Sequence, residues 1–393
     1  MKMAGKAGIN VHVENLRLRF INRVWRVVLG VFGLQLDIFD VKHSSNCWKK
    51  IIYAGSMRLL HAITNLHIFV VFTYDFIRNV KPAFPLISLL TSQLISFYTA
   101  IICLKRGKKI RVVYRKIIIN LSTAEDLLTK FDRNTKFYFL LLMVTTTTLT
   151  INHILKFIRA ENYQLKYREF HAQMGIHNDY FSNITAVIDY FGAFMFTYLF
   201  MDVMFVYFAH LCNGLALNFL LFNRCLETEL RSISLTPSKL NVLRHQYGCI
   251  SELVDEVSRL FSPLILLWIS SLVSNLCLDI RAIKSASSTG VVLFYSRFIL
   301  NSFRGTIFLL LILKMASQIN TQAHLMKQKL LLRAMDERAD KIMSKANYQL
   351  FCDAIGSSNI GISVSGLFTL NITSLLNIVG TVLTYTIILY QTA

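Results

Sequence analysis

The sequence is poor in charged residues and in proline. Only 16% of its 393 residues are charged, against about 25% in a typical soluble domain, and 54% are apolar. Its four prolines are Pro82, Pro85, Pro237 and Pro263. A transporter built from two repeats would be expected to carry paired helices interrupted by Gly or Pro, and this pattern is absent. The low charge therefore excludes an ordinary soluble domain, and the scarcity of proline disfavours a small-molecule transporter.

The chain also lacks the residue patterns of disulfides, metal sites and catalytic centres. None of its seven cysteines lies in a segment that we expect outside the cell, so no structural disulfide is predicted. The cysteines lack metal-ligand spacing. The apolar blocks contain no paired carboxylates, no histidine cluster and no nucleophile elbow. We therefore expect no cofactor, no bound metal and no enzymatic activity.

Apolar residues are gathered into blocks long enough to cross a bilayer. A helix needs about 20 mostly apolar residues to span the hydrocarbon core, and it satisfies its own backbone there. The sequence predicts an all-α membrane protein with seven transmembrane helices, at 59–77, 85–104, 137–158, 187–211, 261–280, 291–313 and 362–390. The first is the weakest prediction because it contains His61, Asn65, His67 and Asp75.

Basic residues predict how these helices are oriented. With the N-terminus in the cytoplasm, 31 of the 42 Lys and Arg residues lie in cytoplasmic segments and only 7 in outer segments. The C-terminus then lies outside the cell, because the number of spans is odd. We therefore interpret the net charge of +20 as basic loops of a multi-pass plasma-membrane protein rather than as a nucleic-acid surface.

The predicted topology divides the chain into six parts. Apolar residues at helical spacing, such as Leu331, Met335 and Ile342, predict that the inner segments are helical extensions of the membrane bundle. In order, the parts are a basic cytoplasmic arm (1–58), helices one to four with the basic segment 105–135 (59–211), a cytoplasmic helical segment (212–260), helices five and six (261–313), a second cytoplasmic helical segment (314–361), and the seventh helix with a short outer tail (362–393).

Two charged residues lie inside predicted spans at similar depth. Asp202 and Arg304 are roughly 22 and 20 Å from the outer ends of the fourth and sixth spans, at about 1.5 Å per residue. Charges inside a membrane are costly and usually functional, so a buried Asp202–Arg304 ion pair is one hypothesis. The alternative is that both side chains lie near the inner membrane edge and face solvated surface.

Polar and aromatic residues near the outer ends of the spans are candidates for a small-ligand pocket. The alternative is that they are interfacial anchors. The candidates are Tyr74, Ser92, Asn152, His153, Asp189, Tyr190, Asn275, Tyr295 and Asn301. Asn183 begins an Asn-Ile-Thr glycosylation sequon in a predicted outer segment, although it lies close to the fourth span.

The end of the chain carries a short motif. Thr384, Ile388 and Gln391 share one face of the predicted seventh helix. This ending resembles the insect gustatory receptor family, whose signature is Thr-Tyr, five mostly hydrophobic residues and Gln-Phe. Thr384, Tyr385 and Gln391 match, and Thr392 stands where the family has Phe. The length near 400 residues, the cytoplasmic N-terminus and the long inner segments are also similar to that family.

The resemblance implies a taste receptor that is itself a ligand-gated, non-selective cation channel. It implies four identical or related subunits around one pore, joined by their inner helical segments and surrounded by lipid. A small-molecule tastant would bind in the outer half of each subunit. Carried over by position, the pore and gate residues are Thr384, Tyr385, Ile388, Gln391 and Thr392.

A G-protein-coupled receptor is the alternative seven-helix class. It would require the opposite topology, against the distribution of basic residues. The sequence also lacks Asp/Glu-Arg-Tyr after the third span, Asn-Pro-x-x-Tyr in the seventh, and a cysteine in an outer loop.

Overall fold

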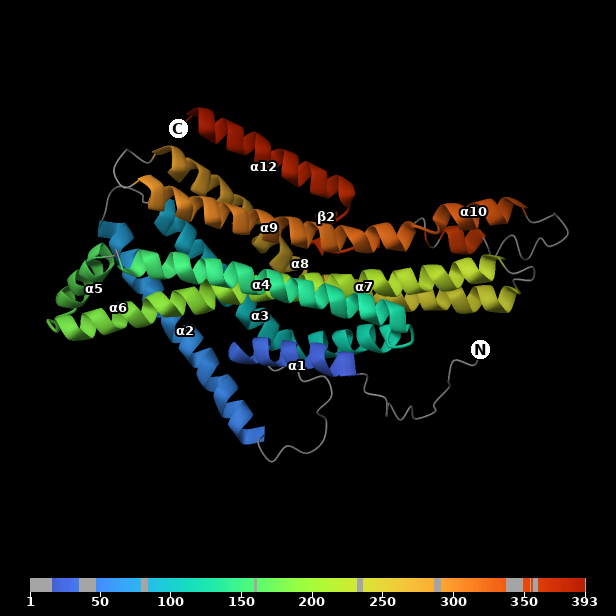
Figure 1. Cartoon of the computed structure of the whole chain (residues 1–393), viewed down its shortest axis with the longest axis horizontal. Helices are drawn as coiled ribbons and strands as arrows, with labels where there is room; N and C mark the ends of the chain where they lie inside the picture. The colour runs from blue at the N-terminus through green and yellow to red at the C-terminus, as the bar shows by residue number, and fades with distance from the viewer. Residues whose placement is uncertain are drawn as a thin grey trace.

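The computed structural model of the chain is an elongated bundle of helices (Figure 1). It describes residues 16–34, 47–78, 84–158, 161–231, 236–285, 291–336, 349–353, 355 and 360–392. The long helices are α2 (Cys47–Arg78), α3 (Phe84–Leu121), α4 (Glu125–Ile158), α7 (Phe200–Arg231), α8 (Pro237–Ser285) and α9 (Val291–His324). The shorter ones are α1 (Leu16–Val31), α5 (Glu161–Gln173), α6 (Asp179–Ala193), α10 (Lys327–Asp336) and α12 (Ile372–Thr392).

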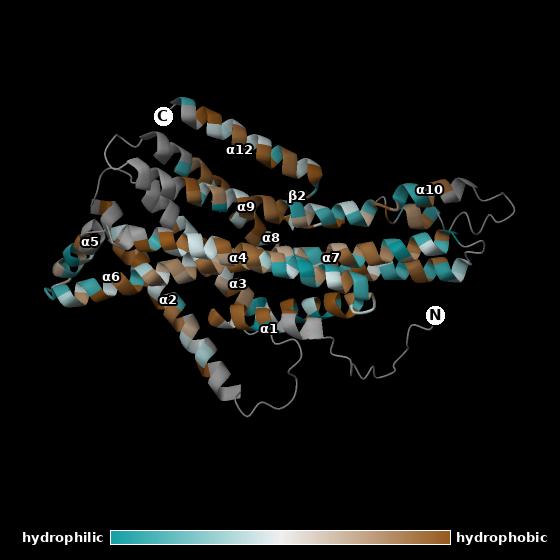
Figure 2. Cartoon of the chain, viewed as in Figure 1, coloured by the Kyte–Doolittle hydropathy of each residue, from teal (hydrophilic) through white to brown (hydrophobic). Residues whose placement is uncertain are grey.

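Three helical runs in the described part of the chain are long and apolar enough to cross a membrane. They are Asp179–Arg231, Pro237–Asp279 and Ile299–Leu330, and Ile372–Ile388 is a shorter apolar helix. The predicted first three spans lie within α2, α3 and α4, which also contain many polar and basic residues. Figure 2 shows hydrophilic residues gathered on α10 and at the adjoining end of α7. The helical, membrane-type architecture is thus evident, and the count of seven remains a prediction.

Helix α7 forms the centre of the bundle. Every residue from Phe200 to Phe219 is buried, as expected of a helix that is apolar on all sides. It packs against α3, α4, α8 and α9. A π-helix, η1 (Phe194–Leu199), joins α6 to α7, and the hydroxyl of Ser96 donates a hydrogen bond to the Phe196 carbonyl. Such π-segments interrupt the regular helix and occur often at functional sites.

The seventh helix begins ten residues later than predicted. Two short strands, β1 (Ser363–Val364) and β2 (Phe368–Thr369), form an antiparallel hairpin within the predicted span 362–390. Ser365 and Gly366 take positive φ values of 51° and 76° in the turn. A reciprocal cap starts α12, because Asn371 and Ser374 each accept, at 2.8 Å, a hydrogen bond from the other's backbone N–H. The polar residues before Asn371 therefore belong to a hairpin and not to a polar transmembrane wall.

Pro263 creates a gap in the hydrogen bonds of α8, and Arg106 of α3 fills it. Proline has no N–H, so the Arg259 carbonyl has no donor within the helix. Arg106 of α3 donates from Nη1 to the carbonyls of Arg259 and Leu260, both at 2.8 Å. The hairpin also bonds to α8, because Ser365 donates its N–H to Ser262 Oγ at 2.6 Å. The start of the final helix is thus tied to the proline site.

Arg106→Ala should lower the free energy of unfolding by about 1–3 kcal/mol, because it leaves the Arg259 carbonyl unsatisfied. Thermal unfolding of the detergent-purified protein would measure the loss. Lys105→Ala, an exposed neighbour, is the control. In a Pro263→Ala background the helix regains its own donor, so the Arg106→Ala loss should shrink. Equal losses in both backgrounds would mean that Arg106 does not compensate for the proline.

Candidate functional site

The ion pair Asp202–Arg304 lies inside the bundle. Arg304 Nη1 donates to Asp202 Oδ1 at 2.6 Å, and the two side chains are 17% and 0% exposed respectively. Asp202 occupies the first turn of α7, directly after η1. The Arg304 guanidinium also lies 5.5 Å from the ring centroid of Tyr198. Asp202 Oδ2 and Arg304 Nε have no hydrogen-bond partner among the described residues, so the pair retains one acceptor and one donor for another polar group.

Aromatic residues extend this site toward the end of the bundle that is predicted to lie outside the cell. The ring of His153 lies 5.4 Å from Tyr190, 5.0 Å from Phe194 and 5.3 Å from Tyr198, centroid to centroid. The Tyr190 hydroxyl donates to the His153 carbonyl at 2.8 Å. The structure thus brings His153 and Tyr190 together beside η1, and Tyr198 connects them to Arg304. We call these residues with Asp202 the outer aromatic site.

Three buried polar residues in or beside η1 were not among the sequence candidates. His61 Nε2, both amide atoms of Gln93 and Thr197 Oγ1 have no hydrogen-bond partner in the part of the chain that the structure describes. Gln93 is only 2% exposed, and the His61 ring stacks on Phe196 at 4.7 Å. Buried polar atoms left unpaired cost about 1–3 kcal/mol each. The sequence could have indicated these residues because polar residues in an otherwise apolar span are often functional. His61 was noted only as a reason to regard the first predicted span as the weakest.

Asp189 belongs to a separate group that joins α2, α5 and α6. It accepts hydrogen bonds from the Tyr167 hydroxyl at 2.8 Å and from His67. Tyr74 packs nearby against Phe170, with centroids 5.4 Å apart. Neighbouring His171 bonds to Ser182 at 3.0 Å, and its burial, with a smaller contribution from His67, lowers the pKa of its imidazole. This buried group fixes the predicted outer segment to α2 and is closed by its own contacts.

The remaining candidates are dispersed. Asn275 Nδ2 donates to Ser92 Oγ at 3.3 Å, which links α8 to α3. Asn301 is half-buried on α9, and the Asn183 amide oxygen accepts a hydrogen bond from Arg168 Nε at 3.2 Å. The side chains of Asn152 and Tyr295 lie outside the described part of the structure. The seven ligand candidates whose side chains the structure describes therefore do not form one pocket.

Helix α12 has two contrasting faces. Leu375, Ile378 and Val382 pack against the hydrophobic core. The opposite face is exposed, and Ile388 on it is 45% exposed. This face, which we call the α12 stripe, consists of Thr373, Asn377, Gly380, Thr384, Ile388 and Gln391. Tyr385 lies beside the stripe and is also exposed, and the side chain of Thr392 is outside the described residues.

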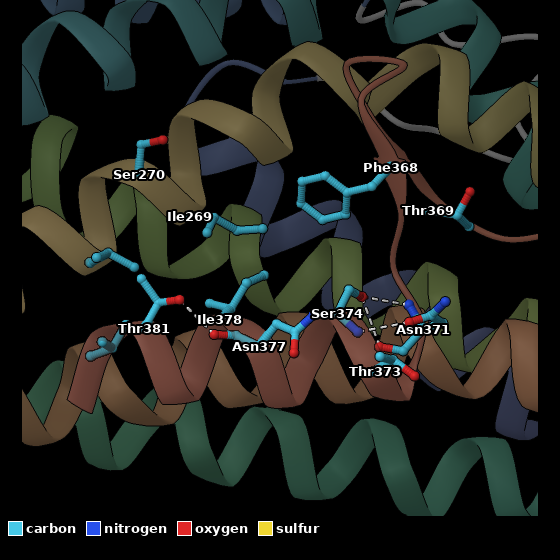
Figure 3. Close-up of a pocket in the computed structure, with 12 residues that line it drawn as sticks. Ile269, Ser270, Phe368, Thr369, Asn371, Thr373, Ser374, Asn377, Ile378 and Thr381 are labelled. Carbon is cyan, nitrogen blue, oxygen red and sulfur yellow. Dashed lines mark hydrogen bonds between the residues drawn. The ribbon is translucent and has the colours of Figure 1, made fainter. Parts of the chain in front are cut away.

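A cleft of about 660 Å³ separates part of α12 from α8. Figure 3 shows Ile269 of α8, Phe368 of the hairpin and Ile378 of α12 facing one another across it. Asn371, Ser374 and Asn377 line the same cleft. Helix α12 is therefore held by the hairpin at its start and by one apolar face, which leaves space for its movement relative to α8.

In the described residues, no group of three His, Cys, Asp or Glu side chains could hold a metal ion.

Comparisons with known proteins identify the family. The fold is similar to that of the insect olfactory receptor OR5 from Machilis hrabei, with a TM-score of 0.67, 14% identity, and coverage of 96% of this chain and 98% of that one. The same receptor in complex with eugenol also gives 0.67 and 14%, covering 98% of this chain and 99% of that one. No curated protein matches the sequence. Residues 18–393 match the family described as 7tm chemosensory receptors, and the chain belongs to that family.

Proposed function

We propose that this chemosensory receptor is a taste receptor and a ligand-gated, non-selective cation channel of the plasma membrane. The observation that carries the proposal is the α12 stripe, which exposes the side-chain amides of Asn377 and Gln391 on a mostly apolar helix. Lipid would not satisfy these groups, whereas a water-filled path would. Ligand binding in the outer half of the bundle would open this path.

The pore requires more than one subunit, because one stripe forms only part of a wall. Closed rotational symmetry is the usual arrangement of identical subunits. A tetramer, either homomeric or mixed with related subunits, would direct four α12 stripes toward one axis. The proposed topology has seven spanning helices with the N-terminus inside, and the inner segments 212–260 and 314–361 would join the subunits.

The ligand in this proposal is a small molecule bound beside η1. The relative from Machilis hrabei has been solved in complex with eugenol. In this chain the outer aromatic site supplies rings, while His61, Gln93 and Thr197 supply neutral donors and acceptors. Aromatic rings together with a few polar groups suit a neutral ligand that carries hydroxyl or carbonyl groups.

Recording currents from cells that express the chain would test the function. A panel of sugars and bitter compounds should reveal a ligand that evokes a current, and the reversal potential should shift when sodium is replaced by a large organic cation. Responses that require a G protein, or an N-terminal epitope stained on intact cells, would instead favour the alternative G-protein-coupled receptor.

Gln93→Leu should raise the half-maximal ligand concentration about threefold to tenfold, because one hydrogen bond is worth about 0.5–1.5 kcal/mol. The concentration dependence of the ligand-evoked current measures this shift. Unliganded current should stay unchanged, since Gln93 belongs to α3 and is not part of the α12 stripe. The control is Leu94→Ala, whose side chain is exposed. An equal shift in both variants would mean that Gln93 does not contact the ligand.

A further inference from the structure

A second cavity lies between α1, α3 and α7, away from the outer aromatic site and the α12 stripe. Its volume is about 190 Å³, far more than the roughly 10–15 Å³ that one water molecule needs. We call it the inner cavity. It is lined by Leu29, Leu34, Cys103, Leu104, Gly107, Lys108, Ile110, Arg111, Met204 and Tyr207. Among the described residues, the lining thus combines apolar side chains with two cations and includes no carboxylate.

The base of the inner cavity contains a polar group without a partner. Tyr207 is 1% exposed, and its hydroxyl has no hydrogen-bond partner among the residues that the structure describes. Tyr207 lines the cavity, and its ring packs against Trp25 with centroids 4.9 Å apart. A buried hydroxyl normally bonds to something. Its position beside Lys108 and Arg111 indicates a ligand that accepts hydrogen bonds and carries negative charge.

Gly107 leaves the wall of the inner cavity open. A Cβ atom built at Gly107 would meet no atom within 4 Å. Glycine in the middle of a helix is destabilising by about 0.5–1 kcal/mol relative to alanine, so its presence in α3 has no local helical reason. A larger side chain at this position would extend into free space and reduce the cavity.

The position of the inner cavity along α3 suggests where its ligand comes from. The predicted second span ends at Leu104, and five of the next seven residues are Lys or Arg. Arg106 is already bonded to α8, while Lys108 forms no ion pair with any residue in the described ranges. In the proposed orientation, this level is that of the cytoplasmic headgroups. Clusters of basic residues directly inside a spanning helix attract anionic lipids, at about 1 kcal/mol per charge.

We propose that the inner cavity binds the phosphate-bearing headgroup of an anionic lipid from the inner leaflet. Lys108 and Arg111 would contact the phosphate oxygens, the Tyr207 hydroxyl would donate a hydrogen bond to one of them, and Leu29, Leu34 and Leu104 would contact the glycerol and the first methylenes. A bound lipid would connect α1 to α3 and α7. The site uses the proposed membrane orientation but does not require channel activity.

Titration of a fluorescent short-chain phosphatidylinositol 4-phosphate into the detergent-purified, full-length protein tests the proposal. Lys108→Gln with Arg111→Gln should weaken binding about 25-fold, since each charge contributes about fivefold. The matched control, Lys105→Gln with Lys109→Gln, removes the same charge from residues that do not line the inner cavity, and should weaken binding less than about threefold. Equal losses in the two double variants would indicate nonspecific attraction and overturn the site.

Three further variants test the cavity itself. Gly107→Leu should prevent binding, whereas Gly107→Ala should retain most of it. Tyr207→Phe should weaken binding about threefold, as expected for one hydrogen bond. Full binding by Gly107→Leu would refute the inner cavity as the site. Inorganic phosphate should not displace the lipid at millimolar concentration, and displacement by phosphate with the same affinity would overturn the lipid assignment. Because binding is the readout, a failed channel assay does not affect this test.

Discussion

Arg304→Met should remove most of the receptor from the cell surface. The change leaves Asp202 buried and charged without its partner, and breaking a buried ion pair from one side costs about 3–5 kcal/mol. That is a large part of the 5–15 kcal/mol that stabilises a typical folded protein. Surface biotinylation and the thermal stability of the detergent-purified protein would measure the loss. Asp202→Asn should be milder, since it leaves a partly exposed guanidinium rather than a fully buried carboxylate.

The double variant Asp202→Asn with Arg304→Met separates the pair from its individual members. It should recover surface expression relative to Arg304→Met alone, because no unpaired charge remains inside the bundle. Arg231→Gln is a matched control, since Arg231 forms a solvent-exposed pair with Glu227 at 3.0 Å and its loss should leave surface expression nearly unchanged. Additive losses from Asp202→Asn and Arg304→Met would show that the two residues act independently.

The sequence predicted the family from a very short segment. Thr384, Tyr385 and Gln391 carried the resemblance, and it is confirmed at the level of the chemosensory receptor family. Depth along a helix follows from residue number alone, so the similar depth of Asp202 and Arg304 in two different spans was predictable from the sequence. Taste rather than smell, the cation channel and the tetramer remain proposals, since the solved relatives are only 14% identical and support the fold alone.

Other features depended on tertiary contacts that composition does not encode. Polar residues such as Ser363 and Thr369 suit both a polar span and a hairpin, and the bonds from the hairpin to Ser258 and Ser262 of α8 show which one forms. The spacing of apolar residues around Gln93 does not show whether its amide is buried near a ligand or exposed on the surface. Its burial results from the packing of α3 against η1 and α8. The sequence therefore predicts how deep in the membrane each site residue lies, but not which way its side chain faces.

Ile388→Ala should raise the unliganded current several-fold, and Gln391→Ala should change relative cation permeability more than ligand sensitivity. Ile388 and Gln391 are three residues apart and adjacent on the α12 stripe. A ring of Ile side chains can close a pore by excluding water, and a ring of Gln amides can contact a partly dehydrated cation. Recordings without ligand, and reversal potentials with mixed cations, measure the two effects.

Cysteine substitution distinguishes a pore face from a packing face. Within one subunit, α12 packs against the core through Leu375, Ile378 and Val382, whereas Ile388 and Gln391 lie on the opposite, exposed side. A charged thiol reagent applied from outside should therefore block the open-channel current of Ile388→Cys and Gln391→Cys within seconds to minutes. Val382→Cys is the control on the opposite face, beside the cleft that faces α8, and its labelling should leave the open-channel current unchanged. If the reagent leaves the current of both stripe variants untouched while labelling Val382→Cys, the stripe packs between subunits and another surface lines the pore.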